Sequence, residues 1–236
     1  MSDIYYHGPV VTFDLDDTLF PEREFCRSGF RHILQRVADE SREDIYKKMC
    51  KALESRGNPF EPYVDHIYNP ILHGADREAW LKSVIEEYRN HIPEALTLDP
   101  DAEELLHKLK ESGVKMALVT DGRSNTQRRK IDALGLKEFI PEENLYISEE
   151  VGEDKLNPRS FADIVRKYPE ARAFYYVGNN EKKDFLQPNL LGWTTVKVSP
   201  RHDAVHPDYI NPDPVGRPTY VVDDMREILQ TLNIEH

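Results

Sequence analysis

The chain has 236 residues, of which 39% are hydrophobic and 31% are charged, so we expect a globular protein with one domain or a core domain with a smaller companion. Its formal net charge of −12, from 31 Lys and Arg against 43 Asp and Glu, repels nucleic-acid phosphates and argues against a nucleic-acid-binding protein.

Six short runs of apolar and β-branched residues, separated by wide intervals, predict the strands of a sheet. They lie at residues 10–15, 114–120, 144–148, 174–178, 194–198 and 219–223. Helical patterns fall between most of them, at residues 101–112, 124–134, 159–167 and 224–232. Because strands that alternate with helices form parallel sheets, we expect an α/β fold, with a Rossmann-like parallel sheet and helices on both faces.

Residues 21–95 break this alternation, because they contain no convincing strand. Amphipathic patterns there predict helices at residues 22–40, 42–56 and 77–91. We therefore expect an α/β core domain of residues 1–20 and 96–236 and an all-helical insertion of residues 21–95. Near the C-terminus, residues 200–218 are rich in Pro, His and Asp and predict a long surface loop.

Two aspartates, Asp14 and Asp16, lie at the end of the first predicted strand. Carboxylates at the end of a buried strand are costly unless they face a cleft, a metal or a helix N-terminus. In an open parallel sheet, ligands bind at the carboxyl edge of the strands. Taken alone, the pair fits an acidic turn that caps the next helix as well as it fits a catalytic site.

Three later segments place polar side chains at the same edge. Thr120 and Asp121 follow the second strand, Lys155 comes after the third, and Asn179 and Asp184 follow the fourth. Each alone fits an ordinary turn or a surface side chain. Together they supply a nucleophile, an acid, phosphate donors, a cation and metal ligands, which is the set that phosphoryl transfer requires.

The order of these motifs resembles that of the haloacid dehalogenase-like (HAD) hydrolase superfamily. The resemblance depends on Asp14-x-Asp16-x-Thr18, Thr120, Lys155 and Gly178-Asn179-x-x-x-x-Asp184, and it extends from about residue 8 to the last strand. It implies that the helical insertion is a cap that closes over the active site and selects the substrate. It also implies the phosphatase branch, because the dehalogenating branch lacks the second aspartate, here Asp16.

The resemblance implies a role for each matching residue. Asp14 would attack phosphorus and form an aspartyl-phosphate, and Asp16 would act in turn as general acid and general base. Thr120 and the backbone N–H of Asp121 would bind the phosphoryl group. Lys155 would neutralise charge on the phosphate and on Asp14.

The implied cofactor is Mg²⁺, which would stabilise the charge on the phosphoryl oxygens. Its ligands would be the Asp14 carboxylate, the Asp16 backbone carbonyl, and Asp184 or Asn179. Relatives usually have Asp at the position of Asn179. Because an amide oxygen carries no charge, we expect weaker magnesium binding here than in a relative with Asp.

These expectations describe a magnesium-dependent phosphatase of a small phosphate monoester: a phosphosugar, a phospho-acid or a nucleoside monophosphate. Two alternatives remain open, a non-catalytic binding or regulatory protein that keeps the fold, and a phosphotransferase. The sequence indicates neither the physiological substrate nor the oligomeric state.

The chain carries no signal for membrane contact or export. Its N-terminal residues lack the basic flank and apolar run of a signal peptide, and no segment is apolar over the length of a membrane span. The two cysteines, Cys26 and Cys50, lack the spacing of a metal site or a disulfide framework. We therefore expect a cytoplasmic protein in a reducing compartment.

Overall fold

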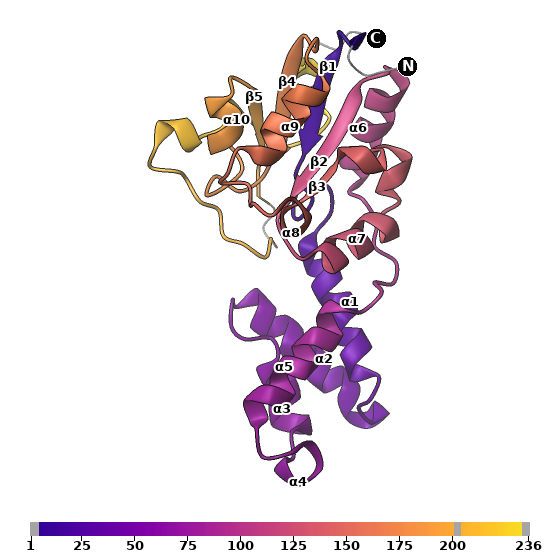
Figure 1. Cartoon of the computed structure of the whole chain (residues 1–236). Coiled ribbons are helices and arrows are strands. Elements are labelled where there is room, and N and C mark those ends of the chain that lie inside the picture. Colours follow the sequence, from indigo (N-terminus) through magenta and orange to yellow (C-terminus); the bar gives the residue numbers. More distant parts are fainter. Residues whose placement is uncertain (1–4, 201–203, 233–236) are drawn as a thin grey trace. The chain divides into compact units, whose positions relative to one another are not determined.

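The computed structural model describes residues 5–200 and 204–232. Six strands form one sheet in the order β3-β2-β1-β4-β5-β6, and every neighbouring pair is parallel (Figure 1). The strands are β1 (Pro9–Phe13), β2 (Lys115–Thr120), β3 (Leu145–Ile147), β4 (Ala173–Gly178), β5 (Thr194–Val198) and β6 (Tyr220–Val222). The predicted Rossmann-like parallel sheet is confirmed.

The strand β1 lies at the centre of the sheet, between β2 and β4, and all five of its residues are buried. Its run of apolar and β-branched residues reflects burial on both faces. Val10 packs with Ala117 and Val119 of β2 against Phe161 and Ile164 on one face. The first strand was predicted to reach residue 15, but it ends at Phe13, before Asp14 and Asp16.

Helices cover the sheet as the alternating pattern predicted. The core helices are α6 (Pro100–Glu111), α7 (Ser124–Ala133), α8 (Ser148–Val151), α9 (Arg159–Lys167), α10 (Leu186–Leu190) and α11 (Glu227–Thr231), with single 3₁₀ turns at Leu136–Glu138, Glu142–Asn144 and Pro214–Gly216. The last helix begins three residues later than predicted. Asp224 forms a turn before it, in which its carboxylate accepts hydrogen bonds from the Arg226 backbone and guanidinium.

The insertion is entirely helical within the described residues. Its helices are α1 (Glu22–Leu34), α2 (Asp39–Glu54), α3 (Glu61–Ile67), α4 (Pro70–His73) and α5 (Arg77–Arg89). The first of them was predicted to reach residue 40 but ends at Leu34, because Arg42 donates hydrogen bonds to the carbonyls of Leu34 and Val37. Two short helices, α3 and α4, were not predicted. Both have a proline in the first turn, a position that proline tolerates well.

The chain divides into two compact units, Met1–Pro21 with Thr97–His236, and Glu22–Leu96. Each has its own hydrophobic core. In the helical unit the buried cluster includes Phe30, Ile33, Met49 and Val84. The predicted domain boundaries, after residues 20 and 95, lie one residue from the boundaries of these units.

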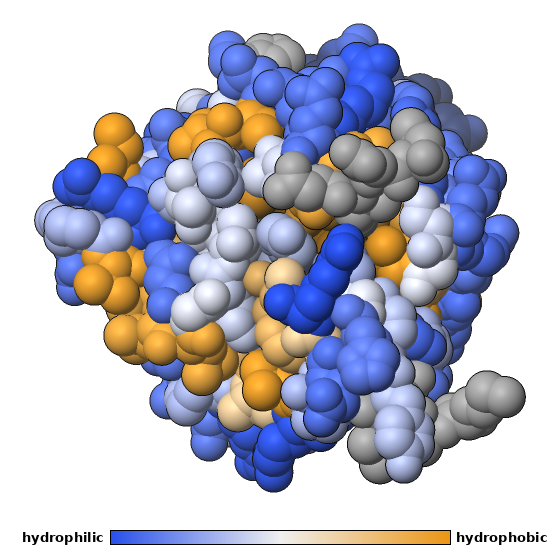
Figure 2. Space-filling model, turned by 90° about the horizontal axis from the view of Figure 1, so that it is seen from above, coloured by the Kyte–Doolittle hydropathy of each residue, from blue (hydrophilic) through white to orange (hydrophobic). Residues whose placement is uncertain are grey.

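The predicted loop of residues 200–218 is largely irregular from residue 204 onward. Residues 201–203 lie outside the described part. Asn189 donates hydrogen bonds to the carbonyls of Val215 and Arg217 and so holds the loop to the core. Figure 2 shows apolar groups interspersed with polar ones on the face that it presents. No helix in residues 5–200 and 204–232 has the length and apolar character needed to cross a membrane.

Candidate active site

Four chain segments meet at the carboxyl edge of the sheet around β1. Asp14 directly follows β1, and its backbone N–H donates to the carbonyl of Val177 in β4 at 2.8 Å. Thr120 ends β2, on the other side of β1. The chain runs outward from β1 through β2 to β3 and then returns to β4, so this edge is the topological switch point, where ligands of such sheets bind.

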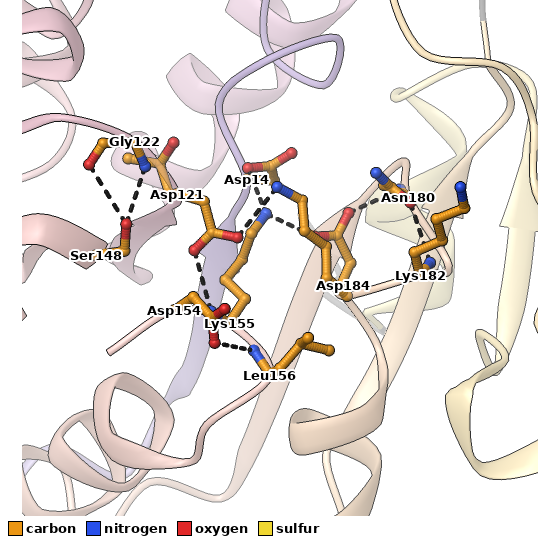
Figure 3. A network of polar contacts seen from close by, with 12 residues as sticks. Asp14, Asp121, Gly122, Ser148, Asp154, Lys155, Leu156, Asn180, Lys182 and Asp184 are labelled. Atoms are coloured by element: carbon orange, nitrogen blue, oxygen red, sulfur yellow. Dashed lines mark hydrogen bonds and ion pairs between the residues drawn. The ribbon is translucent and has the colours of Figure 1, made fainter. Parts of the chain in front are cut away.

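Lys155 lies at the centre of this edge. Its Nζ is 2.7 Å from Asp14 Oδ1 and 2.6 Å from Asp184 Oδ1, and Figure 3 shows it between the two carboxylates. All three side chains are buried, with exposed fractions of 5% for Asp14, 2% for Lys155 and 0% for Asp184. The structure therefore brings the predicted nucleophile, cation and distal aspartate into direct contact.

Asp184 is held by the loop that precedes it. Its Oδ2 accepts hydrogen bonds from the backbone N–H groups of Asn179 at 3.1 Å and Asn180 at 2.7 Å. Gly178 permits this approach, because a Cβ at that position would lie 2.7 Å from Asp184 Oδ2. The motif Gly178-Asn179-x-x-x-x-Asp184 is thus a closed loop that fixes one buried carboxylate.

Burial and neighbouring charges shift the pKa values of this cluster. Burial raises the pKa of Asp14 to about 6, and Lys155 opposes that rise while Asp184 adds to it. For Lys155, burial alone would lower the pKa, but the two carboxylates outweigh it and raise the pKa well above its usual range. Lys155 is therefore a permanent cation, while Asp14 becomes ionised close to neutral pH.

Asp121 connects this cluster to the loop after β3. Its Oδ1 accepts a hydrogen bond from the backbone N–H of Lys155 at 3.0 Å, and its Oδ2 forms an ion pair with Lys183 at 3.1 Å. The neighbouring Gly122 donates its N–H to the Ser148 hydroxyl at 2.9 Å (Figure 3). The Asp121 side chain therefore positions Lys155.

Asp16 has a different set of neighbours. Its carboxylate accepts hydrogen bonds from Gln127 Nε2 at 2.9 Å and from Lys130 Nζ at 2.7 Å, and Gln127 Nε2 also donates to Thr120 Oγ1 at 2.7 Å. The predicted acid–base residue and the predicted phosphate-binding hydroxyl are thus linked through one amide. Gln127 and Lys130 were not predicted to lie at this edge. The signal that was available is their spacing of three residues on the helix that follows Thr120, which places them on one face.

Oxygen donors at this edge suit a hard cation such as Mg²⁺. Magnesium usually takes one or two carboxylates and completes its shell with substrate phosphate and water. Asp14 and Asp184 both bind one ammonium nitrogen, so their carboxylates lie close together and would provide that number. Within residues 5–200 and 204–232, no group of three or more His, Cys, Asp or Glu side chains is arranged to hold a metal ion by itself.

Asn179 contributes to the described contacts through its backbone N–H, which binds Asp184. The neighbouring Asn180 uses its side-chain oxygen to accept the N–H of Lys182 at 3.0 Å, within its own loop. A ligand role for the Asn179 side chain therefore stays a prediction.

Residues 9–185 match the family model of the haloacid dehalogenase-like hydrolases. The chain belongs to this family. A glyceraldehyde 3-phosphate phosphatase of Methanopyrus kandleri is 30% identical over 92% of this chain and 97% of its own length. A ribulose-1,5-bisphosphate 5-phosphatase of Halopiger xanaduensis is 27% identical over 82% of this chain and 86% of its own.

Solved structures show the same fold. The HAD-hydrolase YfnB from Bacillus subtilis, described as bound to magnesium, superposes with a TM-score of 0.63 at 19% identity and covers 96% of this chain and 99% of its own. A HAD-superfamily hydrolase from Geobacter sulfurreducens has the same TM-score and identity over 99% and 100% of the two chains. The family resemblance proposed from the motifs is therefore confirmed.

Proposed function

We propose that this chain is a magnesium-dependent phosphatase that hydrolyses a small phosphate monoester through an aspartyl-phosphate on Asp14. The observation that carries the proposal is the contact of Lys155 with both Asp14 and Asp184 at the switch point of the sheet. A buried carboxylate beside a permanent cation suits attack on an anionic phosphoryl group, because the cation offsets the repulsion between the two.

In the proposed first step, an oxygen of Asp14 forms a bond to phosphorus while the bond between phosphorus and the ester oxygen breaks. Asp16 gives its proton to that leaving oxygen. In the second step Asp16 takes a proton from water, the water oxygen bonds to phosphorus, and the bond from phosphorus to Asp14 breaks. Inorganic phosphate and the regenerated carboxylate are the products.

The remaining residues bind and orient the phosphoryl group. The Thr120 hydroxyl and the Asp121 backbone N–H would donate hydrogen bonds to phosphoryl oxygens, and Lys155 would neutralise part of their charge. Magnesium, held by Asp14 and Asp184 with the Asp16 carbonyl and Asn179 as further candidate ligands, would stabilise the charge that develops on those oxygens. The pKa of Asp14 is raised to about 6 but stays below neutral pH, so most of this side chain is ionised and nucleophilic at neutral pH.

The relatives support a compact substrate. Their names specify glyceraldehyde 3-phosphate, ribulose 1,5-bisphosphate and phosphoserine, which are all small phosphorylated metabolites. We therefore place phosphosugars first and phospho-acids second in the proposed substrate class, with nucleoside monophosphates third. We further propose that the helical unit of residues 22–96 is the cap that selects among them, because it is inserted directly after the first motif and has its own hydrophobic core.

Within the helical unit, the polar side chains of Tyr63 and Arg27 are engaged in contacts of that unit. Tyr63 is buried and stacks on Trp80 with ring centroids 6.0 Å apart, and Arg27 forms ion pairs with Glu24 and Glu54. Both therefore stabilise the helical unit itself. No disulfide joins the two cysteines, Cys26 and Cys50, which supports the proposed cytoplasmic location.

A phosphate-release panel tests the proposed function. Glyceraldehyde 3-phosphate, ribulose 1,5-bisphosphate, phosphoserine and a nucleoside monophosphate are incubated with the protein, with Mg²⁺ or with EDTA. We expect release from at least one phosphosugar, dependent on Mg²⁺ and abolished in Asp14→Asn. Binding of these esters without turnover would support the non-catalytic alternative, and release that depends on an added acceptor alcohol would support the phosphotransferase.

A further inference from the structure

The helix α7 carries two buried polar side chains on the face that it turns to the sheet edge. Gln127 is 2% exposed and Lys130 is 3% exposed. Burying an amide and an ammonium group is costly unless both are paired. Their partners are Asp16 and Thr120, two residues of the candidate active site, so the cost is offset by contacts at that site.

Both carboxylate oxygens of Asp16 are tied to α7. Lys130 Nζ lies 2.7 Å from Oδ1, and Gln127 Nε2 lies 2.9 Å from Oδ2. A carboxylate held by two donors from one rigid helix has a fixed direction. An acid–base group needs such a fixed direction, because proton transfer requires the correct geometry at the leaving oxygen.

Gln127 also determines the direction in which the Thr120 hydroxyl can donate its hydrogen. The amide nitrogen of Gln127, and not its oxygen, faces Asp16 and donates to Oδ2. The same nitrogen donates to Thr120 Oγ1 at 2.7 Å. A hydroxyl that accepts one hydrogen bond from an N–H keeps its own hydrogen for another acceptor, such as a phosphoryl oxygen.

The position of α7 is itself fixed. A Cβ at Gly122 would lie 3.0 Å from Cγ and Cδ of Gln127, so glycine leaves room for this side chain. At the start of the helix, the Ser124 backbone N–H donates to Glu149 at 2.8 Å, and Arg128 donates to Glu150 at 2.6 Å. The donors of α7 therefore reach Asp16 from a rigid support.

We propose that Gln127 and Lys130 are positioning residues for the reaction. Together they hold the Asp16 carboxylate in place for proton transfer to the leaving oxygen, and Gln127 also directs the Thr120 hydroxyl toward the phosphoryl group. This inference rests on the proposed phosphatase function, and it assigns to each residue an effect that can be measured separately.

The test for Lys130 compares two leaving groups. An alkyl phosphate needs protonation of its leaving oxygen, whereas p-nitrophenyl phosphate releases a stable anion without it. The ratio kcat/KM reports substrate binding and the first phosphoryl transfer, and it is not affected by the later hydrolysis. We expect Lys130→Met to lower kcat/KM roughly a hundredfold for the alkyl phosphate, and by less than about threefold for p-nitrophenyl phosphate.

Three controls accompany this comparison. Lys130→Arg keeps the charge and should restore most of the alkyl phosphate activity. Lys137→Met removes an exposed ammonium 2.9 Å from Asp132. It should leave kcat/KM unchanged for both substrates. In an Asp16→Asn background, Lys130→Met should cause little additional loss, because the residue that it positions is already inactive.

The test for Gln127 measures binding of inorganic phosphate by titration calorimetry in the presence of Mg²⁺. We expect Gln127→Leu to weaken phosphate binding several-fold, whereas Lys130→Met, which leaves the hydrogen bond from Gln127 to Thr120 in place, should not. Equal losses for both leaving groups in Lys130→Met, or unchanged phosphate binding in Gln127→Leu, would overturn the respective assignment. A wild-type protein that cleaves neither ester would refute the phosphatase function first, and the positioning roles with it.

Discussion

Lys155 lies between two buried carboxylates, and the charge balance of these three side chains decides how each of them behaves. Asp14 and Asp184 would repel one another strongly if the ammonium were absent, since the site excludes most water. The same balance leaves Asp14 with a pKa of about 6. At the residue scale, therefore, the nucleophile is maintained at a cost in stability.

The pH dependence of stability should show this cost. Because the pKa of Asp14 rises from 3.8 to about 6 on folding, the folded protein binds more protons at this residue between those pH values than the unfolded chain does. Its contribution to stability therefore falls as the pH rises through this window. We expect the free energy of unfolding of Asp14→Asn, relative to that of the wild type, to increase between pH 4 and pH 7 by at most about 3 kcal/mol.

Urea unfolding at pH 4, 5.5 and 7 in EDTA measures this gain. Asp132→Asn, which changes an exposed carboxylate, provides the control and should show no such trend. A difference between Asp14→Asn and the wild type that does not vary with pH would contradict the raised pKa.

Asn179 allows a second test at the same scale. The family resemblance implies a carboxylate at the position that its amide occupies. We expect Asn179→Asp to increase magnesium affinity, because a second charge near Asp184 attracts the cation. Calorimetric titration with Mg²⁺ measures this affinity, and Asn180→Asp at the adjacent position is the control. Equal or weaker binding in Asn179→Asp would remove this residue from the ligand set.

At the scale of single elements, the strands and the turns after them account for the site. The sequence predicted all six strands within a few residues, because each is a short run rich in apolar, aromatic and β-branched residues. It predicted helix ends less well. The end of α1 depends on Arg42, which binds carbonyls at Leu34 and Val37 from eight and five residues further along the chain, and no local pattern indicates such a contact.

The turn after β4 can be tested through Gly178. A methyl group there would lie 2.7 Å from Asp184 Oδ2 and would displace that carboxylate from Lys155. We expect Gly178→Ala to lower phosphatase activity at least tenfold and to weaken magnesium binding. Gly57→Ala is the matched control, because the nearest atom to its added Cβ is 3.5 Å away. Full activity in Gly178→Ala would show that the reaction does not require the Asp184 carboxylate to lie beside Lys155.

At the scale of the whole molecule, two separate hydrophobic cores indicate two units that can lose structure independently. Phe30 is 1% exposed in the helical unit, and Phe161 is 0% exposed in the α/β unit. The active-site contacts described above all lie within the α/β unit. Damage to one core should therefore have a different consequence from damage to the other.

Paired alanine substitutions test this independence. Each of Phe30→Ala and Phe161→Ala should cost about 3–5 kcal/mol of local stability. We expect Phe30→Ala to increase hydrogen exchange mainly within residues 22–96, and Phe161→Ala to increase it within the α/β unit. Exchange that rises equally throughout the chain in both variants would indicate one cooperative unit.

The sequence by itself determined the parallel α/β fold, the helical insertion and the family, because apolar periodicity and the order of motifs are local properties of the chain. It also identified Asp14, Lys155 and Asp184 as one group. Only the tertiary structure decided that Lys155 bridges the two carboxylates, and that Asp16 is instead held by α7. Contacts between residues more than a hundred positions apart, such as that of Lys130 with Asp16, depend on how packed elements meet, and no local pattern records that.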